Sequence, residues 1–214
     1  MEDWIAQLFL DKKLLKMGHF QRKEDLNLGL GWLYYSLARI IRPKTVVIIG
    51  SYRGFTPLVF GKALKQNIEE SKIIFIDPSF VDNFWNNSQD VQDYFKSFGV
   101  DNIEHFLMTT QEFVECETYK KLKEIDLVFI DGYHVKEQAK FDYEAFENLV
   151  TSQGMVLFHD STKSFYSKIY GKDKAYTHTV KYFIDELKEN TNLQIFDFPF
   201  ANGVTLVRKI NNIE

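Results

Sequence analysis

The segment IDLVFIDGYHVKEQAKFDYEAF, residues 125–146, decides the fold class. Its first seven residues form an apolar run that ends at Asp131, which predicts a strand buried on both faces of a sheet. A helical pattern follows, and we expect a helix over 136–150 with Ala139, Tyr143 and Phe146 on one stripe. A buried strand followed by an amphipathic helix is typical of the repeating unit of a parallel sheet.

The same alternation of strands and helices recurs along the chain. Further strands are expected at 45–50, 72–77, 103–108 and 154–160, and helices at 55–70, 88–99, 110–122 and 176–190. Helical spacing also runs through the first forty residues, with one helix near residues 4–9 and a second over 26–40. The chain should close with LQIFDFPF and VTLVRKI, two antiparallel strands about a tight Asn-Gly turn.

This order predicts an α/β fold of the Rossmann-like, doubly wound kind. We expect a mostly parallel seven-stranded sheet with a C-terminal antiparallel hairpin and N-terminal helices. The 214 residues fit one domain, with a helical cap at 1–42 that packs on a core at 43–214. A hydrophobic fraction of 45% is sufficient for a core of this size.

Composition limits the partners and the compartment. A net charge of −4 gives no electrostatic footprint for nucleic acid, so we expect no nucleic-acid partner. No apolar run approaches the roughly 18 residues of a membrane span, so we expect no membrane partner. The N-terminus lacks the pattern of a signal peptide, and one cysteine excludes an intramolecular disulfide. We expect a cytoplasmic protein; a homo-oligomer is left open.

Polar residues and glycines follow the expected strands. In an open parallel sheet, ligands bind outside the carboxyl ends of the strands, so these residues are the candidates for a site. They are Gly50-Ser51-Tyr52, Asp77, Thr109-Thr110, Asp131-Gly132-Tyr133-His134 and His159-Asp160-Ser161.

The first strand leads into GSYRGFTP, with glycines at positions 50 and 54 before a helix. This spacing lets a backbone approach a nucleotide-like ligand, although Gly50 also fits an ordinary turn. The patterns G-x-G-x-x-G and Gly-Lys-Ser/Thr are absent, which disfavours NAD and ATP. Asp77 would accept hydrogen bonds from both hydroxyls of a ribose, or else would cap a loop.

Asp131 and Asp160 would close adjacent strands of a doubly wound sheet. Together they would hold a hard divalent cation, or each would cap the loop that follows it. His134 is a candidate general base, with a structural histidine as the alternative. We expect the remaining histidines, His19, His105 and His178, to be structural.

Several of these segments resemble class I S-adenosylmethionine-dependent methyltransferases. The segments are VVIIGSYRGFTPLVFGKAL, IIFIDP, FIDGYHVKEQAKFDYEAFENLVTSQGMVLFHDS and the closing hairpin. The resemblance covers about residues 28–209. It is closest to the group related to macrolide-sugar O-methyltransferases and cephalosporin-hydroxylase-like proteins.

The resemblance implies a role for each candidate residue. Gly50, Ser51, Tyr52 and Gly54 would cradle the methionine portion of S-adenosyl-L-methionine, and Asp77 would hold its ribose. Thr110 and Gln111 would lie near the adenine. Asp131 would serve as a cofactor-side or metal-side acid beside the candidate base His134. Asp160 resembles the second metal-binding acid of metal-dependent members, and His159 stands next to it.

Two residues depart from the family pattern. Ile48 occupies a position where the first strand of family members usually carries an acid. Metal-dependent members usually have two acids, or an acid and an amide, at the end of the fifth strand, where this chain has His159 and Asp160. Imidazole is a poor magnesium ligand, so a softer divalent metal, Mg²⁺ and no ion at all are left open.

We therefore expect an S-adenosylmethionine-dependent methyltransferase that acts on a small-molecule hydroxyl, such as that of a sugar. The segments FVDNFWNNS and STKSFYSKIYGKDKAY are expected to line the acceptor side. A catalytically lapsed binding protein with the same fold is the alternative, and Ile48 and His159 favour it. A third reading, an NAD-linked oxidoreductase, needs the glycine pattern that is absent.

Overall fold

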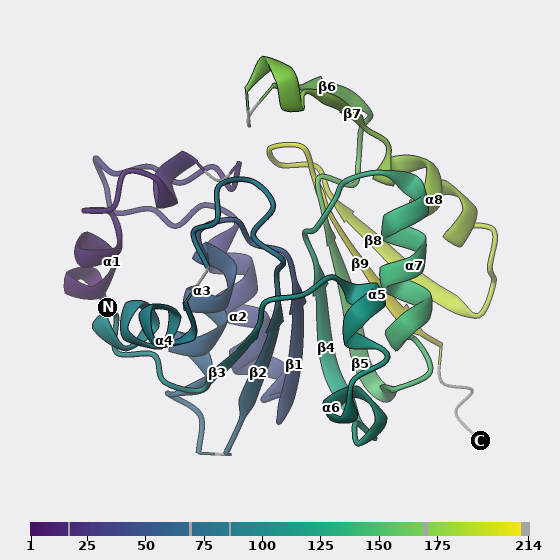
Figure 1. Cartoon of the computed structure of the whole chain (residues 1–214). Coiled ribbons are helices and arrows are strands. Elements are labelled where there is room, and N and C mark those ends of the chain that lie inside the picture. Colours follow the sequence, from purple (N-terminus) through teal and green to yellow (C-terminus); the bar gives the residue numbers. More distant parts are fainter. Residues whose placement is uncertain (17, 69, 86, 169–170, 211–214) are drawn as a thin grey trace. The chain divides into compact units, whose positions relative to one another are not determined.

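The computed structural model describes residues 1–16, 18–68, 70–85, 87–168 and 171–210. The chain separates into two compact units, Met1–Thr109 and Thr110–Glu214 (Figure 1). Within the described ranges, no helix combines the length and the apolar character that a membrane crossing requires. The expectation of a single domain at 1–214, with a cap at 1–42 and a core at 43–214, stays a prediction.

The first unit is built on three parallel strands in the order β3-β2-β1. These are β1 (Thr45–Ile49), β2 (Lys72–Ile76) and β3 (Ile103–Phe106). The register pairs Val47 with Ile74 and Ile74 with Glu104. Four of the five residues in β1 and in β2 are buried, which explains why both strands read as continuous apolar runs.

Helices complete the first unit. They are α1 (Glu2–Leu8), the short 3₁₀ helix η1 (Leu14–Lys16), α2 (Gly31–Ile41), α3 (Phe55–Leu64) and α4 (Ser88–Ser97). The N-terminal helix α1 is tied to the end of α4 by two side-chain hydrogen bonds. Trp4 Nε1 donates to the carbonyl of Phe98 at 2.9 Å, and Gln7 Nε2 donates to that of Ser97 at 2.8 Å.

The second unit carries four strands in the order β4-β5-β9-β8. These are β4 (Ile125–Ile130), β5 (Val150–His159), β8 (Leu193–Phe198) and β9 (Val204–Lys209). Strands β4 and β5 are parallel, whereas β9 runs antiparallel to both β5 and β8. The helices are α5 (Thr110–Phe113), α6 (Glu117–Lys120), α7 (Lys136–Phe146), α8 (Val180–Leu187) and the 3₁₀ helix η2 (Lys172–Lys174).

These elements confirm the expected fold class. The structure has the seven strands of a mostly parallel sheet, helices between them, and a C-terminal antiparallel pair. The parallel neighbours β4 and β5 end at Ile130 and His159, so Asp131 and Asp160 follow adjacent strands as expected.

Several expected helices are shorter than their sequence pattern, among them those expected over 55–70 and 88–99, which end at Leu64 and Ser97. The segment 110–122 forms two short helices, because Cys116 takes an extended conformation between them. Helix α7 ends at Phe146 because Val150 already pairs with Ile125 as the first residue of β5. The second N-terminal helix begins at Gly31, since Arg22 and Asn27 form a bridge and Leu26 has a positive φ.

The expected helix over 176–190 was wrong in its first turn. Residues Tyr176–His178 form strand β7, which pairs antiparallel with β6 (Phe165–Ser167), and α8 begins only at Val180. The aromatic and β-branched residues of this short segment suit a strand, but the partner strand lies about ten residues earlier and leaves no local signal.

The turn between β8 and β9 is longer than expected. Residues 199–203 separate the two strands, in place of a tight Asn-Gly turn. Pro199 has no N–H with which to extend the ladder. Gly203 has a φ of 91°, and a Cβ there would lie 2.0 Å from the Oγ1 of Thr162.

We predict that Gly203→Ala destabilises the protein more than Gly99→Ala. Both glycines have a positive φ, which costs an alanine about 1–2 kcal/mol. Only at Gly203 does the new methyl group also collide with a neighbour, which adds about 1–3 kcal/mol. Chemical denaturation of both variants measures the difference. Equal losses would show that the loop moves away from Thr162 at no cost.

Candidate functional site

The segment after β1, Gly50–Gly54, forms a tight loop, which we call the glycine loop. Gly50, Tyr52 and Gly54 have φ values of 70°, 49° and 82°, and Gly54 N donates to the carbonyl of Ser51 at 2.9 Å. A Cβ on Gly54 would lie 2.9 Å from the ring of Phe95, so a side chain is excluded by sterics as well as by backbone conformation. Helix α3 starts directly after the loop.

The carboxylate of Asp77 holds the glycine loop from the end of β2. Its Oδ2 accepts the backbone N–H of Ser51 at 3.1 Å, and its Oδ1 accepts that of Ser79 at 2.7 Å. Each carboxylate oxygen accepts more than one hydrogen bond, so both remain able to accept a ribose hydroxyl. The geometry therefore suits the expected ribose contact, which stays a prediction.

His105 supports Asp77 from β3. Its Nε2 lies 3.2 Å from the carbonyl oxygen of Asp77, and burial lowers the pKa of His105 to about 4. The imidazole is therefore neutral near pH 7 and donates Nε2–H to that carbonyl. This places His105 in the structural role that we expected.

A buried hydroxyl in the glycine loop fits a ligand. The Oγ of Ser51 is buried and makes no hydrogen bond to any residue that the structure describes. A buried hydroxyl without a partner costs free energy unless a bound group or a water satisfies it. Together with the left-handed backbone at Gly50 and Gly54, this atom matches a loop that receives a polar small molecule.

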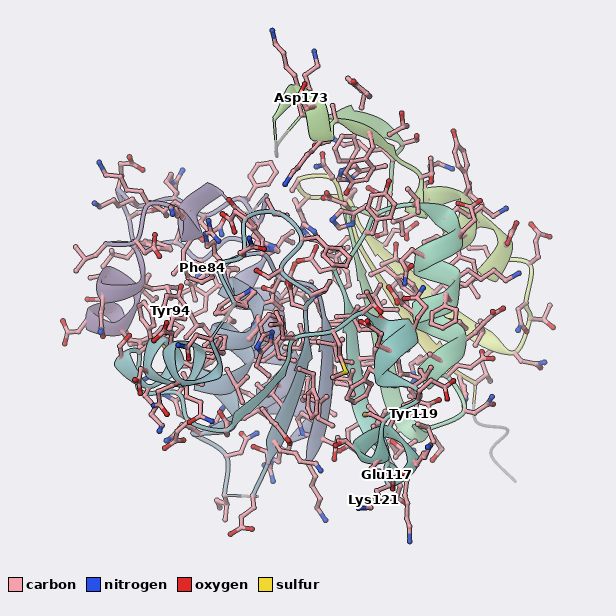
Figure 2. The ribbon with its side chains drawn as sticks, in the orientation of Figure 1. Phe84, Tyr94, Glu117, Tyr119, Lys121 and Asp173 are labelled. Carbon is pink, nitrogen blue, oxygen red and sulfur yellow. The ribbon has the colours of Figure 1, made fainter. Side chains whose placement is uncertain are left out.

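Arg53 clamps the same loop, and the sequence did not point to it. Its side chain is buried and forms an ion pair with Asp82, with Nη1 to Oδ1 at 2.9 Å. The guanidinium lies 4.2 Å from the ring centre of Phe84, and Tyr94 donates its hydroxyl proton to the Arg53 carbonyl at 3.0 Å. Phe84 and Tyr94 are labelled in Figure 2.

The second unit gathers five ionisable side chains, four of them buried and Asp131 half-buried, which we call the Asp-His cluster: Asp131, His134, His159, Asp160 and His178. Asp131 follows β4, and His134 lies in the loop before α7. His159 ends β5, Asp160 follows it, and His178 ends β7. Every one of these side chains is at most 10% exposed.

Distances within the cluster are short. His159 Nδ1 lies 2.8 Å from Asp131 Oδ1 and 3.6 Å from Asp160 Oδ1. His134 Nε2 lies 3.5 Å from Asp131 Oδ1 and 4.0 Å from Asp160 Oδ2. His178 Nδ1 lies 3.1 Å from Asp160 Oδ2, and its ring stacks on that of His134 with centres 4.5 Å apart.

Burial and mutual charge set the protonation states. Burial lowers the pKa of His134, against the opposing effect of Asp160 and Asp131, so its imidazole is neutral near pH 7. Burial alone would raise the pKa of Asp160, but the neighbouring imidazoles hold that pKa well below its ordinary value. The cluster thus combines a buried carboxylate with an imidazole that has a free lone pair to offer.

Two members of the cluster are not satisfied by the protein. The two ring nitrogens of His178 make no hydrogen bond to any described residue, and the same holds for the Oδ1 of Asp160. The Nδ1 of His178 lies 3.1 Å from the Oδ2 of Asp160, close enough for the two groups to interact electrostatically. Buried polar atoms of this kind call for a bound ion, a water or a functional role.

The backbone of Asp160 is strained. Its φ is 52°, a left-handed conformation that costs about 1–2 kcal/mol for a residue with a side chain. Ser161 secures this conformation by donating its N–H to the carbonyl of Gly203 at 3.3 Å and its hydroxyl proton to that of Phe158 at 3.0 Å. The strain turns the Asp160 carboxylate into the cluster.

Sequence reasoning missed His178 as a member of the site. It was expected to be a structural histidine at the start of a helix, whereas the β6–β7 pairing places it beside Asp160. The one available signal was the Tyr-Thr-His alternation, which is too short to identify a strand by itself. The roles expected for Asp131, His134, His159 and Asp160 stay predictions.

The residues expected near the adenine are linked to α7. Gln111 donates to Gln138 at 2.8 Å, and Gln138 donates to the carboxylate of Asp142 at 2.8 Å. The buried hydroxyl of Thr110 also bonds to Asp142. Burial raises the pKa of Asp142 to about 6, with Thr110 and Gln138 opposing part of that rise.

We predict that Asp142→Asn gains stability over the wild type as the pH rises. The folded protein holds the Asp142 proton up to about pH 6, whereas an ordinary carboxyl loses it near 3.8. Its contribution to the free energy of unfolding therefore falls between about pH 4 and 6, by on the order of 2–3 kcal/mol.

Urea denaturation at pH 4 and pH 7.5 measures this effect. The exposed Asp173 gives the matched control Asp173→Asn, which should follow the wild type at both values (Figure 2). A difference between Asp142→Asn and the wild type that is the same at both pH values would contradict the assignment of a raised pKa to Asp142.

Comparison with known proteins gives one family and several solved structures. Residues 47–161, more than half of the chain, match the family model of a methyltransferase domain. Among curated proteins, none matches the chain. The matched segment begins in β1 and ends just after Asp160, so it includes the glycine loop and four of the five residues of the Asp-His cluster.

Solved methyltransferases share the fold at low sequence identity. One is PaMTH1 from Podospora anserina with S-adenosylhomocysteine bound: 18% identity, 92% of this chain, 88% of that one, TM-score 0.62. A putative O-methyltransferase from Klebsiella pneumoniae is 14% identical, and the match covers 94% of this chain and 89% of that one with a TM-score of 0.67. A third is TomG from Streptomyces achromogenes, an O-methyltransferase of tomaymycin synthesis solved with S-adenosylmethionine. It is 15% identical, and the match covers 94% of this chain and 91% of that one with a TM-score of 0.62.

Proposed function

We propose that this chain, which belongs to the methyltransferase domain family and is an S-adenosylmethionine-dependent methyltransferase, methylates a hydroxyl group of a small molecule. The observation that carries this proposal is the Asp-His cluster, which offers buried groups that can take or stabilise a hydroxyl proton. The sequence resemblance to the group related to macrolide-sugar O-methyltransferases supports an acceptor of sugar or natural-product type.

The first unit supplies the proposed contacts to the methionine and ribose of the cofactor. The glycine loop offers backbone at Gly50, Tyr52 and Gly54 and the buried hydroxyl of Ser51. Asp77 offers two carboxylate oxygens that accept the N–H groups of Ser51 and Ser79, and a carboxylate oxygen can accept more than one hydrogen bond. S-adenosylmethionine, when bound, supplies an electrophilic methyl group on a sulfonium leaving group.

The second unit supplies the proposed contacts to the adenine and the acceptor. Thr110 and Gln111 are held by the network around Asp142 and are proposed to lie near the adenine. Asp131 is proposed to act on the cofactor side or on a metal. Of the expected acceptor segments, Asn86, Ile169 and Tyr170 lie outside the described residues.

The proposed chemistry is an in-line displacement at the methyl carbon. With S-adenosylmethionine bound, the acceptor oxygen would take the methyl group with S-adenosylhomocysteine as the leaving group, and the Nε2 of His134 would accept the hydroxyl proton. The neutral imidazole of His134 is able to accept it, and Asp131 and Asp160 stabilise the charged ring that results. Alignment of the two reacting atoms supplies the rest of the rate enhancement.

A divalent cation would assist the same step. Asp131, Asp160 and His159 would offer oxygen and nitrogen donors, and the His159 Nδ1 lies 2.8 Å from an Asp131 oxygen and 3.6 Å from an Asp160 oxygen. A cation there would lower the pKa of the acceptor hydroxyl and orient it.

We predict that the protein binds S-adenosylmethionine and that Asp77→Asn weakens this binding about 10- to 100-fold. A charged hydrogen bond to a ribose hydroxyl is worth about 1.5–3 kcal/mol. Titration calorimetry measures the dissociation constants, with Asp101→Asn, an exposed carboxylate in the same unit, as the control. Absence of binding at millimolar cofactor in the wild type would refute the proposed function.

We predict methyl transfer to at least one member of a panel of sugars and natural-product alcohols, with loss of about 10²- to 10⁴-fold in His134→Gln. Mass spectrometry detects the methylated product, and calorimetry checks that the variant still binds the cofactor. Cofactor binding without transfer to any alcohol on the panel would contradict the proposal and favour a catalytically lapsed protein.

A further inference from the structure

The donor atoms of the Asp-His cluster favour one class of ion. Three of its five side chains are imidazoles, and the other two are carboxylates. Imidazole nitrogen is a good ligand for zinc, iron, cobalt, nickel and copper, whereas magnesium prefers oxygen donors and water. A site built for magnesium would gain nothing from three histidines.

The spacing of these atoms matches a shared ion. Two donors that each lie about 2.1 Å from one ion are about 3.0 Å apart at a right angle and about 4.2 Å apart when opposite. The donor pairs of the cluster are separated by 2.8 Å at the closest and 4.0 Å at the widest among those given above. Two triads, Asp131-His134-His159 and His134-Asp160-His178, each keep all ligand atoms within 4.8 Å, and they share His134.

The buried polar atoms that lack a hydrogen-bond partner among the described residues also favour a bound ion. The Nδ1 of His178 and the Oδ1 of Asp160 are buried and have no hydrogen-bond partner among the described residues. A set of ordinary Asp–His hydrogen bonds would leave neither of them in this state. An ion between the donors would satisfy both atoms and would neutralise carboxylate charge that burial otherwise makes costly.

We propose that Asp131, His134, His159, Asp160 and His178 together bind one first-row transition-metal ion of the Zn²⁺ type in preference to Mg²⁺, with His134 and His178 as ligands. The catalytic role of this ion rests on the proposed function, whereas the binding of the ion does not require methyl transfer. In the metal-loaded protein the Nε2 of His134 would be a ligand, so the ion would lower the pKa of the acceptor hydroxyl and the proton would pass to water instead of to His134.

Ligation by His178 would also fix the β6–β7 hairpin. His178 ends β7 and pairs with Phe165, and its carbonyl accepts the hydroxyl proton of Ser164 at 2.8 Å. The next residue, Thr179, donates its N–H to the carbonyl of His134 at 2.8 Å. A metal held by His134 and His178 therefore joins the hairpin to the loop after β4 through side chains as well as backbone.

Titration of the metal-stripped protein tests the site. Calorimetry with Zn²⁺ should give one ion per chain, and the same titration with Mg²⁺ should give no saturable binding at comparable concentrations. Co²⁺ should give visible absorption bands that Zn²⁺ abolishes. A Zn²⁺ titration without saturable binding, or equal binding of Mg²⁺, would overturn the proposal without any variant having to fold.

Histidine variants separate ligation from general binding to imidazole. His178→Ala should weaken Zn²⁺ binding at least about tenfold, and His134→Gln should do the same. His19→Gln, a buried histidine of the first unit that stacks on Phe55, should leave the affinity unchanged. Unchanged affinity in both cluster variants would remove His134 and His178 from the ligand set and overturn the proposal.

Hydrogen exchange gives a readout that a purely structural histidine would not change. The amides of Phe165–Ser167 and Tyr176–His178 should exchange at least about tenfold more slowly with Zn²⁺ bound, because opening the hairpin then breaks a ligand bond. The same amides in His178→Ala should not respond to Zn²⁺. Equal exchange in the wild type with and without Zn²⁺ would contradict ligation by His178.

Failure of this inference is distinguishable from failure of the proposed function. A protein that binds S-adenosylmethionine and methylates alcohols but takes up no Zn²⁺ would leave the function in place and remove the metal. A protein that binds Zn²⁺ at the cluster but not S-adenosylmethionine would do the reverse.

Discussion

The cost of burying two carboxylates and three imidazoles together is the constraint on which the second unit depends. Each of these side chains is at most 10% exposed, and the histidines are drawn from three separate segments of the chain. Removing charged groups from water costs several kcal/mol per ion unless they are paired or bound to a cation. Such a group of residues is costly to a fold that only needs a core, and it is therefore the feature that function must explain.

Surrounding structure secures this arrangement at the level of the backbone. Asp160 keeps a left-handed conformation because Ser161 is bonded to the loop that ends in Gly203, and that glycine leaves room for Thr162. The first unit shows the same principle on a smaller scale. There Asp77 and Arg53 fix the glycine loop, and the Ser51 hydroxyl makes no hydrogen bond to any residue that the structure describes. In both units the unsatisfied polar atoms of the site lie at the ends of strands or just after them, whereas the buried parts of β1, β2 and β4 are apolar.

Sequence reasoning succeeded where one physical rule dominates. The apolar runs of β1, β2 and β4 identified strands buried on both faces, and an acid at the end of a strand identified Asp77, Asp131 and Asp160 as residues outside the core. It failed where the partner is distant. His178 enters the cluster only because β7 pairs with β6, and Arg53 is buried only because Asp82 and Phe84 enclose it. Neither contact leaves a periodic trace in the chain. The finer statements, which concern the acceptor and the ion, depend on loop geometry that periodicity does not encode.

The most direct test of this account is the anomalous scattering of crystals grown with Zn²⁺, measured on both sides of the zinc absorption edge. We predict one peak in the Asp-His cluster, about 2.0–2.2 Å from a nitrogen of His134, His159 and His178 and from oxygens of Asp131 and Asp160. A crystal with no peak at the cluster, and with these histidines hydrogen-bonded to the carboxylates or to water, would contradict the claim that the buried charges are there to hold a metal.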